Sequence, residues 1–126
     1  MDNRLIKRCR NYSIHTLSTL CNILQIHCYD GDTCTTIDGE KIRLACIDTP
    51  ELKGKKANPV AAKEARDFLN NVVSNTEVNI RRITTDRYGR TVAELHSGNI
   101  NIQKLLVDKG YGQIYKKYSN QCEWSK

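Results

Sequence analysis

The stretch LQIHCYDGDTCTTIDGEKIRLAC, residues Leu24 to Cys46, decides the fold of this chain. Apolar and polar residues alternate from Leu24 to Cys28, which is the period of a half-buried strand. Residues 33–37 are mostly β-branched, and the pair Asp38-Gly39 that follows is a strong hairpin signal. Residues 41–46 alternate again and would place Cys46 on the apolar face of a third strand. The sequence therefore predicts a three-stranded meander.

The pattern downstream of this meander changes to helical spacing and then back to strands. An apolar stripe at helical spacing begins at Pro59, a residue that suits a first helical turn. Two strands are expected over 76–83 and 91–96. A short helix over 102–109 follows, with Asn101 as its N-cap. Five strands with a helix between the third and the fourth predict a mainly β protein with helices, an OB-fold barrel.

Length and charge limit the class of protein and the partners that it can have. The chain has 126 residues, enough for one domain with a single modest core. Lys and Arg outnumber Asp and Glu by 20 to 14, giving a net charge of +6. Many small proteins are simply basic, but a basic surface also suits a polyanionic partner. No segment has the length of a transmembrane helix, so no membrane association is expected.

Three short blocks carry residues suited to phosphodiester hydrolysis: Asp30 to Thr33, Arg43 to Glu51, and Asp86 to Arg90. Two carboxylates can hold a hard divalent cation, and a third can take a proton from water. Two guanidinium groups can bind the phosphoryl oxygens. The blocks, their order and their spacing resemble the staphylococcal nuclease (thermonuclease) family, over a region from about Ile23 to Tyr118.

This resemblance implies a calcium site and a catalytic base. Asp32 and Asp48 would bind Ca²⁺ together with the backbone carbonyl of Thr49 and several waters, in keeping with the oxygen ligands that Ca²⁺ prefers. Glu51 would activate the attacking water. Asp30 is expected to support the loop rather than to bind the ion. Each of these acidic residues alone would read as a turn or surface residue.

The resemblance also implies the residues that bind the nucleic acid. Arg43 and Arg90 would hold the phosphate as negative charge builds in the transition state. Arg87, Tyr88 and Tyr118 match family positions that contact the phosphate and the base of the nucleotide. Stacking on tyrosine tolerates any base.

Further lysines bear on this expected surface. Lys116 stands where the family has a tyrosine, so base contacts are expected to differ there. Lys53, Lys55 and Lys56 form a basic loop that could steer the backbone of a nucleic acid, or could simply be solvated.

The expected function is that of a hydrolase acting on phosphodiester bonds: a monomeric, calcium-dependent nuclease that cleaves DNA and RNA to 3′-phosphate products. The alternative is a catalytically inactive OB-fold module that binds nucleic acid or protein. Degenerate relatives of that kind would lose acidic or arginine members of the set, and this chain keeps all five of the central ones.

The six cysteines and the two ends of the chain leave questions open. No Cys-x-x-Cys pair is present, so a structural zinc site is improbable. The cysteines fit either buried thiols or disulfides. Residues 1–20 are expected to be an extension or a degenerate signal segment, with a lean toward export and the cytoplasm as the alternative; residues 21–126 form the thermonuclease-like domain. The further helix that usually follows in the family is expected to be missing.

Overall fold

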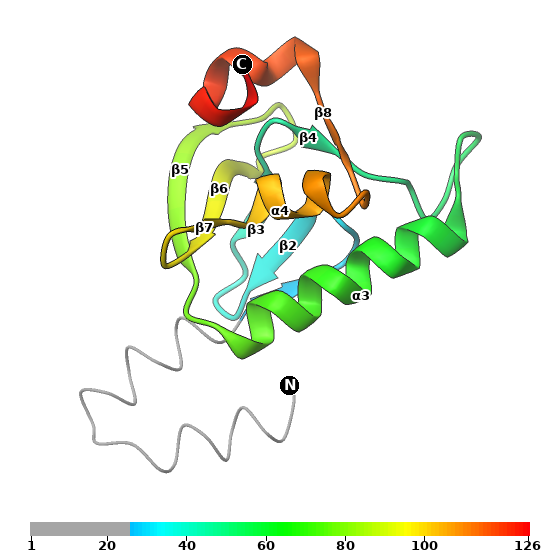
Figure 1. Cartoon of the computed structure of the whole chain (residues 1–126), viewed down its shortest axis with the longest axis horizontal. Helices are drawn as coiled ribbons and strands as arrows, with labels where there is room; N and C mark the ends of the chain where they lie inside the picture. The colour runs from blue at the N-terminus through cyan, green and yellow to red at the C-terminus, as the bar shows by residue number, and fades with distance from the viewer. Residues whose placement is uncertain (1–25) are drawn as a thin grey trace.

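The computed structural model describes residues 26–126, and the elements are labelled as in Figure 1. The strands are β1 (Ile26–Cys28), β2 (Thr33–Thr36), β3 (Lys41–Leu44), β4 (Ile47–Asp48), β5 (Asn79–Thr85), β6 (Thr91–Ser97), β7 (Ile100–Asn101) and β8 (Gln113–Ile114). The helices are α3 (Pro59–Asn75) and α4 (Ile102–Asp108), and two short 3₁₀ turns close the chain, η1 (Lys116–Gln121) and η2 (Glu123–Ser125).

One mixed sheet organises these elements, in the order β1-β2-β3-β6-β5, with β7 paired to β6. The predicted meander is confirmed, because β1, β2 and β3 pair antiparallel in sequence order. Strand β3 then pairs in parallel with β6, with Arg43 opposite Val92. This parallel pair brings the end of the second sequence block next to the strand that follows the third block.

Helix α3 covers the side of the sheet near β1, where it slopes below the strands from the right of Figure 1 to its centre. Asn58 caps its first turn, because its side-chain oxygen accepts a hydrogen bond from Ala61 N at 3.3 Å. The Asn70 side chain donates to the carbonyl oxygen of Cys28 and accepts from its amide, at 2.9 and 2.8 Å. The helix is therefore joined to β1 by hydrogen bonds as well as by apolar packing.

The main core lies between the sheet and the two helices. Its largest fully buried side chains are Ile42, Leu44, Ile47, Leu69, Leu95, Ile102 and Leu106. Asn101 caps α4 as predicted, by accepting from Lys104 N at 3.1 Å, and Gly110 follows the helix with a φ of +82°. That left-handed conformation is the one in which helices commonly end at glycine.

Three expectations about the strands need correction. The described strands form an open mixed sheet, so the predicted barrel is seen only as a mainly β, OB-like arrangement without closure between β1 and β5. Strand β3 ends at Leu44, because Cys46 turns the chain with a φ of +68° instead of continuing the strand. The fourth strand was expected over 76–83 but covers Asn79–Thr85, with a register shift between Arg82 and Thr84.

The cysteines that the structure describes form two disulfides. Cys28 is bonded to Cys34 across β1 and β2, and Cys46 is bonded to Cys122 between the turn after β3 and the last residues of the chain. The expectations for residues 1–20, including a signal segment, lie outside the described residues. Within residues 26–126, neither helix is long and apolar enough to cross a membrane.

Candidate functional site

Four acidic residues converge at one corner of the fold, which we call the carboxylate corner: Asp30, Asp32, Asp48 and Glu51. Asp30 and Asp32 lie in the loop between β1 and β2, whereas Asp48 ends β4. Asp32 is buried, and its Oδ2 atom accepts a hydrogen bond from Thr49 N at 3.1 Å. This bond ties the first sequence block to the second.

The approach of these two segments requires Gly31. A Cβ atom at this position would lie 2.9 Å from the Cβ atoms of Ala65 and Thr49, closer than side chains pack. Any larger residue would push the loop away from α3 and from the segment after β4. The Asp-Gly-Asp sequence is thus a packing requirement as well as a source of carboxylates.

The carboxylate corner carries unfavourable charge repulsion. Burial, and then the neighbouring charge of Asp32, raise the pKa of Asp30 to about 6. Burial is also the largest cause of a raised pKa at Asp48, where Asp32 and Glu51 add repulsion and Arg43 opposes it. A bound cation would relieve this repulsion, because it favours the ionised form of every carboxylate around it.

The donors at this corner fit a hard divalent cation such as Ca²⁺. They are carboxylate oxygens, together with Thr49, whose Oγ1 atom is buried and has no hydrogen-bond partner among the described residues. Between residues 26 and 126, no three His, Cys, Asp or Glu side chains are grouped so as to hold a metal ion by themselves. Asp32 and Asp48 would therefore need main-chain oxygen and water as further ligands.

Arg43 links the carboxylate corner to the rest of the site. Its Nη2 atom lies 3.4 Å from Asp32 Oδ2 and 3.8 Å from Asp48 Oδ1. Its Nη1 atom donates to the carbonyl oxygen of Leu44 at 2.7 Å, which fixes the guanidinium beside its own strand. The Arg43 side chain is mostly buried, and it also lines the pocket described next.

The third sequence block forms a tight turn that orients Arg90. Asp86 Oδ1 accepts from the amides of Tyr88 and Arg90, each at 2.9 Å, and Asp86 Oδ2 accepts from Arg90 Nε at 2.7 Å. Burial raises the pKa of Asp86, but these hydrogen bonds together outweigh it and hold the pKa below its ordinary value. Gly89 supplies the positive φ, +82°, that the turn requires. The Arg90 guanidinium then lies over the Tyr88 ring, 5.4 Å from its centroid.

An open pocket of about 520 Å³ separates this turn from the last part of the chain. One wall, which we call the Tyr88 wall, comprises residues 84–88 and Arg90. The other, which we call the C-terminal wall, is formed by Tyr115, Lys117, Tyr118 and Gln121. The Tyr115 and Tyr118 rings lie 5.2 Å apart, and Lys117 Nζ lies 5.3 Å from the centre of the Tyr118 ring. Cations therefore lie next to aromatic faces on both walls.

The structure brings most of the predicted site residues together. Five of them line the pocket: Arg43, Arg87, Tyr88, Arg90 and Tyr118. Asp32, Asp48 and Thr49 adjoin it through Arg43. Glu51 is exposed, lies outside the pocket lining, and has no side-chain hydrogen bond or ion pair within the described part of the chain. Its place in the cluster rests on its repulsion with Asp48.

Two residues of the pocket were missed at the sequence level. The sequence predicts no role for Asp86, although it forms three bonds within the turn that carries Arg90. Lys117 was not singled out, and its position next to Tyr118 was the only sequence signal. The lysines of the predicted basic loop, Lys53, Lys55 and Lys56, are exposed and do not line the pocket.

Comparison with known proteins places this geometry in a family. The model of the staphylococcal nuclease homologue family matches residues 41–126. An uncharacterized endonuclease of Haemophilus influenzae is 32% identical over 104 residues, which cover 79% of this chain and 54% of that protein. Staphylococcal-like nuclease CAN1 of Arabidopsis thaliana is 33% identical over 86 residues, or 68% of this chain and 25% of that protein.

A third relative, probable endonuclease lcl3 of Pyrenophora tritici-repentis, is 36% identical over 73 residues. The chain thus spans about half of the Haemophilus protein and a quarter of the plant protein. The match to the family model covers well over half of the chain and includes the Arg43–Glu51 and Asp86–Arg90 blocks. From this match and these identities, the chain belongs to the staphylococcal nuclease family.

Proposed function

We propose that this protein is a calcium-dependent nuclease that hydrolyses phosphodiester bonds in both DNA and RNA and leaves 3′-phosphate ends. The observation that carries the proposal is the position of Arg43. Its guanidinium contacts the buried carboxylate of Asp32 and, at the same time, lines the pocket that contains Arg90 and Tyr88. A phosphate in this pocket would lie next to both arginines, and Arg43 would connect it to the acidic cluster.

The residues of the carboxylate corner have two proposed roles. Asp32, Asp48 and the main chain of Thr49 would hold Ca²⁺, which supplies positive charge next to the phosphate when it is bound. Glu51 would accept a proton from the attacking water. Its exposure suits this role, since solvent reaches it directly, and Pro50 stiffens the segment that carries it.

The two arginines would stabilise the charge that develops on phosphorus-bound oxygens. A guanidinium presents a planar pair of donors and keeps its charge throughout the reaction. Arg90 is oriented by Asp86 through its Nε atom, an arrangement that directs the rest of the guanidinium away from that carboxylate. The result is a preorganised donor, which costs little reorganisation as charge builds.

The pocket favours single-stranded or frayed substrate. Tyr88 and Tyr118 are exposed large aromatic residues on opposite walls. Bases stack on such rings only after leaving the duplex, and they do so with little sequence preference. Neither the sugar nor the base is read by the arginines, so we expect both DNA and RNA to be cleaved.

The two disulfides extend the proposal to the compartment, because disulfides form and persist in oxidising environments. We therefore propose an exported protein, acting as a monomer. Analytical ultracentrifugation of the purified chain would test the second point.

The test is digestion of end-labelled single-stranded DNA and RNA with Ca²⁺, with Mg²⁺ and with chelator. We expect cleavage with Ca²⁺ and little with Mg²⁺, which demands tighter octahedral geometry. Treatment of the products with a 3′-phosphatase should change their mobility. Full cleavage in excess chelator would overturn the metal role, and binding without cleavage under every condition would favour a non-catalytic OB-type module.

A further inference from the structure

We propose that the two disulfides act as positioning devices for two separate halves of the site. The Cys28–Cys34 disulfide holds the cation-binding loop, and the Cys46–Cys122 disulfide holds the wall of the pocket that receives the nucleic acid. The inference rests on the proposed function. It assigns an effect on cation binding to Cys28 and Cys34, and an effect on nucleic-acid binding to Cys46 and Cys122.

The first disulfide closes the loop that carries Asp30 and Asp32. Its two cysteines face each other across β1 and β2, and the loop between them is further closed by a 2.8 Å bond from Tyr29 N to the carbonyl oxygen of Thr33. The loop contains only the five residues 29–33 between the cysteines. A loop this short has little freedom once its ends are joined, so the disulfide restricts the directions that both carboxylates can take, together with the bonds from Asp32 N to Asp30 Oδ1 and from Thr49 N to Asp32 Oδ2.

The Cys28–Cys34 disulfide is also fixed to the body of the protein. Both cysteines are fully buried in the main core, and Cys28 is bonded to Asn70 of α3 through both of its main-chain groups. Asp32 O accepts from Leu44 N at 2.8 Å, which connects the loop to β3. The loop therefore takes its position from α3 and the sheet, and not from the C-terminal wall.

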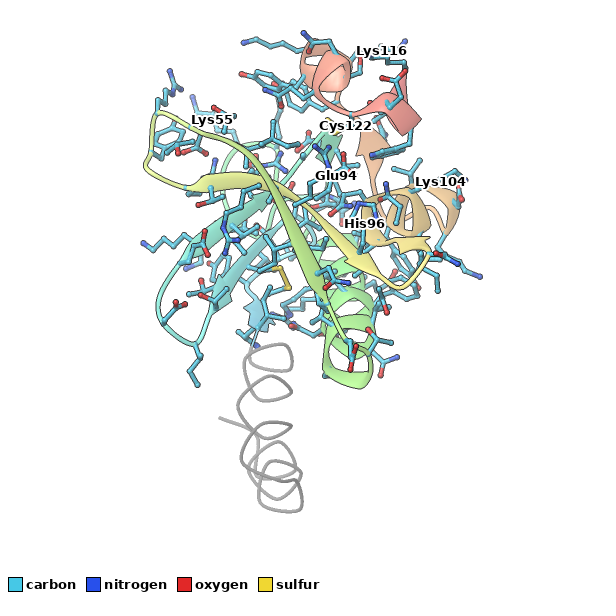
Figure 2. The ribbon with its side chains drawn as sticks, turned by 90° about the vertical axis from the view of Figure 1, so that its left-hand side faces the viewer. Lys55, Glu94, His96, Lys104, Lys116 and Cys122 are labelled. Atoms are coloured by element: carbon cyan, nitrogen blue, oxygen red, sulfur yellow. A yellow bond between two sulfur atoms is a disulfide. The ribbon has the colours of Figure 1, made fainter. Side chains whose placement is uncertain are left out.

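The second disulfide fastens the C-terminal wall to the turn after β3. The carbonyl oxygen of Cys46 accepts from Tyr115 N at 2.8 Å, and its Sγ atom lies 3.3 Å from the carbonyl oxygen of Tyr118. Cys122 is fully buried, on the inner side of the last turns, and Lys116 lies on their outer side (Figure 2). The wall that carries both tyrosines is thus bounded by contacts with Cys46 at its start and by the disulfide at its end.

The C-terminal wall has few other attachments. No residue of η1 is buried, and the wall consists of short 3₁₀ turns rather than a full helix. The second core cluster, formed by Ala45, Cys46 and Cys122, is small, and the partly buried Trp124 packs against both this cluster and the main core that contains Cys28 and Cys34. The antiparallel pair of β4 with β8, directly before Tyr115, is another attachment of this wall. Without the Cys46–Cys122 bond, the tyrosines of this wall would have to be ordered when the substrate binds, and that ordering reduces affinity.

The experiment compares two matched double variants, Cys28→Ala/Cys34→Ala and Cys46→Ala/Cys122→Ala. Calorimetry with Ca²⁺ alone gives the dissociation constant of the cation. Fluorescence anisotropy with a labelled single-stranded oligonucleotide gives the dissociation constant of the nucleic acid. It is measured at saturating Ca²⁺ in a Glu51→Gln background, which slows cleavage. Circular dichroism at low temperature verifies that each variant is folded.

We expect Cys28→Ala/Cys34→Ala to weaken Ca²⁺ binding by about 3- to 10-fold, the scale of ordering one or two side chains, with oligonucleotide affinity nearly unchanged. Cys46→Ala/Cys122→Ala should weaken oligonucleotide binding by a similar factor and leave Ca²⁺ affinity nearly unchanged. Equal effects of both variants on both constants, or no effect of either, would overturn the inference.

Two further arms keep the result interpretable. If an alanine variant does not fold, Cys28→Ala/Cys34→Val and Cys46→Ala/Cys122→Val refill part of the buried volume and are measured in the same way. If the native chain binds no Ca²⁺, the proposed function fails; the oligonucleotide arm is then run without cation and still tests the role of Cys46 and Cys122. Loss of cleavage alone does not enter either readout.

Discussion

The carboxylate corner and the pocket lie side by side, and they are built in opposite ways. At the corner, negative charges are held close together by buried main chain and by Gly31, and burial, together with the charge of Asp32, raises the pKa of Asp30. Around the pocket, positive side chains lie over aromatic rings, as the exposed Arg87 and the half-buried Arg90 do over Tyr88. Arg43 is the residue that belongs to both.

Because of this difference, the corner and the pocket would contribute to binding in two different ways. The corner stores repulsion that a cation relieves, so its contribution depends on a fixed geometry of a few oxygens. The pocket offers tolerant surfaces that attract any polyanion, so its contribution depends on the total charge and on salt. Substitutions at the junction and at Arg90 should therefore affect turnover, whereas those of the other residues on the pocket walls should affect affinity.

The largest effect is expected at the junction itself. Arg43→Lys keeps the positive charge but loses the planar pair of donors, so turnover should fall by about 10²- to 10³-fold, the scale of losing one transition-state donor. Arg82→Lys is the matched control, since that exposed guanidinium pairs with Glu40 away from the pocket. Steady-state kinetics on single-stranded DNA measure both, and equal losses in the two variants would remove the special role of Arg43.

Glu51→Gln should reduce turnover by roughly 10²-fold, as expected for a lost general base, with a smaller change in substrate affinity. Glu64→Gln, at an exposed position on α3, controls for the loss of one negative charge. The measurement is single-turnover cleavage at saturating enzyme. An unchanged rate in Glu51→Gln would mean that another group accepts the proton.

On the pocket side, affinity for single-stranded DNA should fall steeply with salt. Each phosphate neutralised on a single strand contributes about −0.7 to the slope of log affinity against log salt. Arg87→Ala should therefore make the slope shallower by about 0.7 while leaving turnover nearly intact. Arg66→Ala on α3, where the arginine pairs with Asp67, should leave the slope as it is. A flat salt response in the native protein would contradict the proposed phosphate contacts.

The smallest effect is expected far from both regions, at Glu40. Hydrogen bonds from Arg82, together with one from Thr91, lower the pKa of Glu40 from 4.5 to about 2. Because the folded-state pKa lies below the unfolded value, the stabilisation is complete above about pH 4.5 and is lost as the pH falls toward 2.

Glu40→Gln should therefore lower the free energy of unfolding by under about 1 kcal/mol at neutral pH, as for other surface ion pairs, and by progressively less below pH 4.5. Urea unfolding at pH 7, 5, 3.5 and 2.5 measures this difference, and activity at pH 7 should not change. If the difference in the free energy of unfolding between the native protein and Glu40→Gln grew as the pH fell, the pKa of Glu40 would be raised in the folded state rather than lowered.

Local signals in the sequence predicted local structure well. Asn101 and the glycine after α4 mark the helix ends through bonds to nearby residues, so that helix was found almost to the residue. The meander followed from alternation and from the Asp38-Gly39 turn, which the structure shows with Gly39 at a φ of +92°. Each of these features depends on residues within a few positions of one another.

Long-range features were not predictable in the same way. Nothing in the pattern of residues 41–46 shows that Cys46 turns the chain, because the partner that it meets there, Cys122, is at the other end of the domain. Disulfide connectivity cannot be deduced from spacing alone. The parallel pairing of β3 with β6 and the contribution of Lys117 to the pocket likewise arise from tertiary contacts. The roles of the candidate site residues stay predictions until their variants are measured.

The parallel pairing of β3 with β6 has a consequence for how an active molecule is made. In the sequence, α3 and β5 lie between Arg43 and the strand after Arg90. Contacts between segments so far apart in the chain form late, because they require closure of a long loop. During synthesis the acidic residues leave the ribosome well before the turn that carries Arg90 and the wall that carries Tyr118. A growing chain therefore has no complete site while the residues before Arg90 are being made, and under the proposed function this keeps it from cleaving the RNA that encodes it.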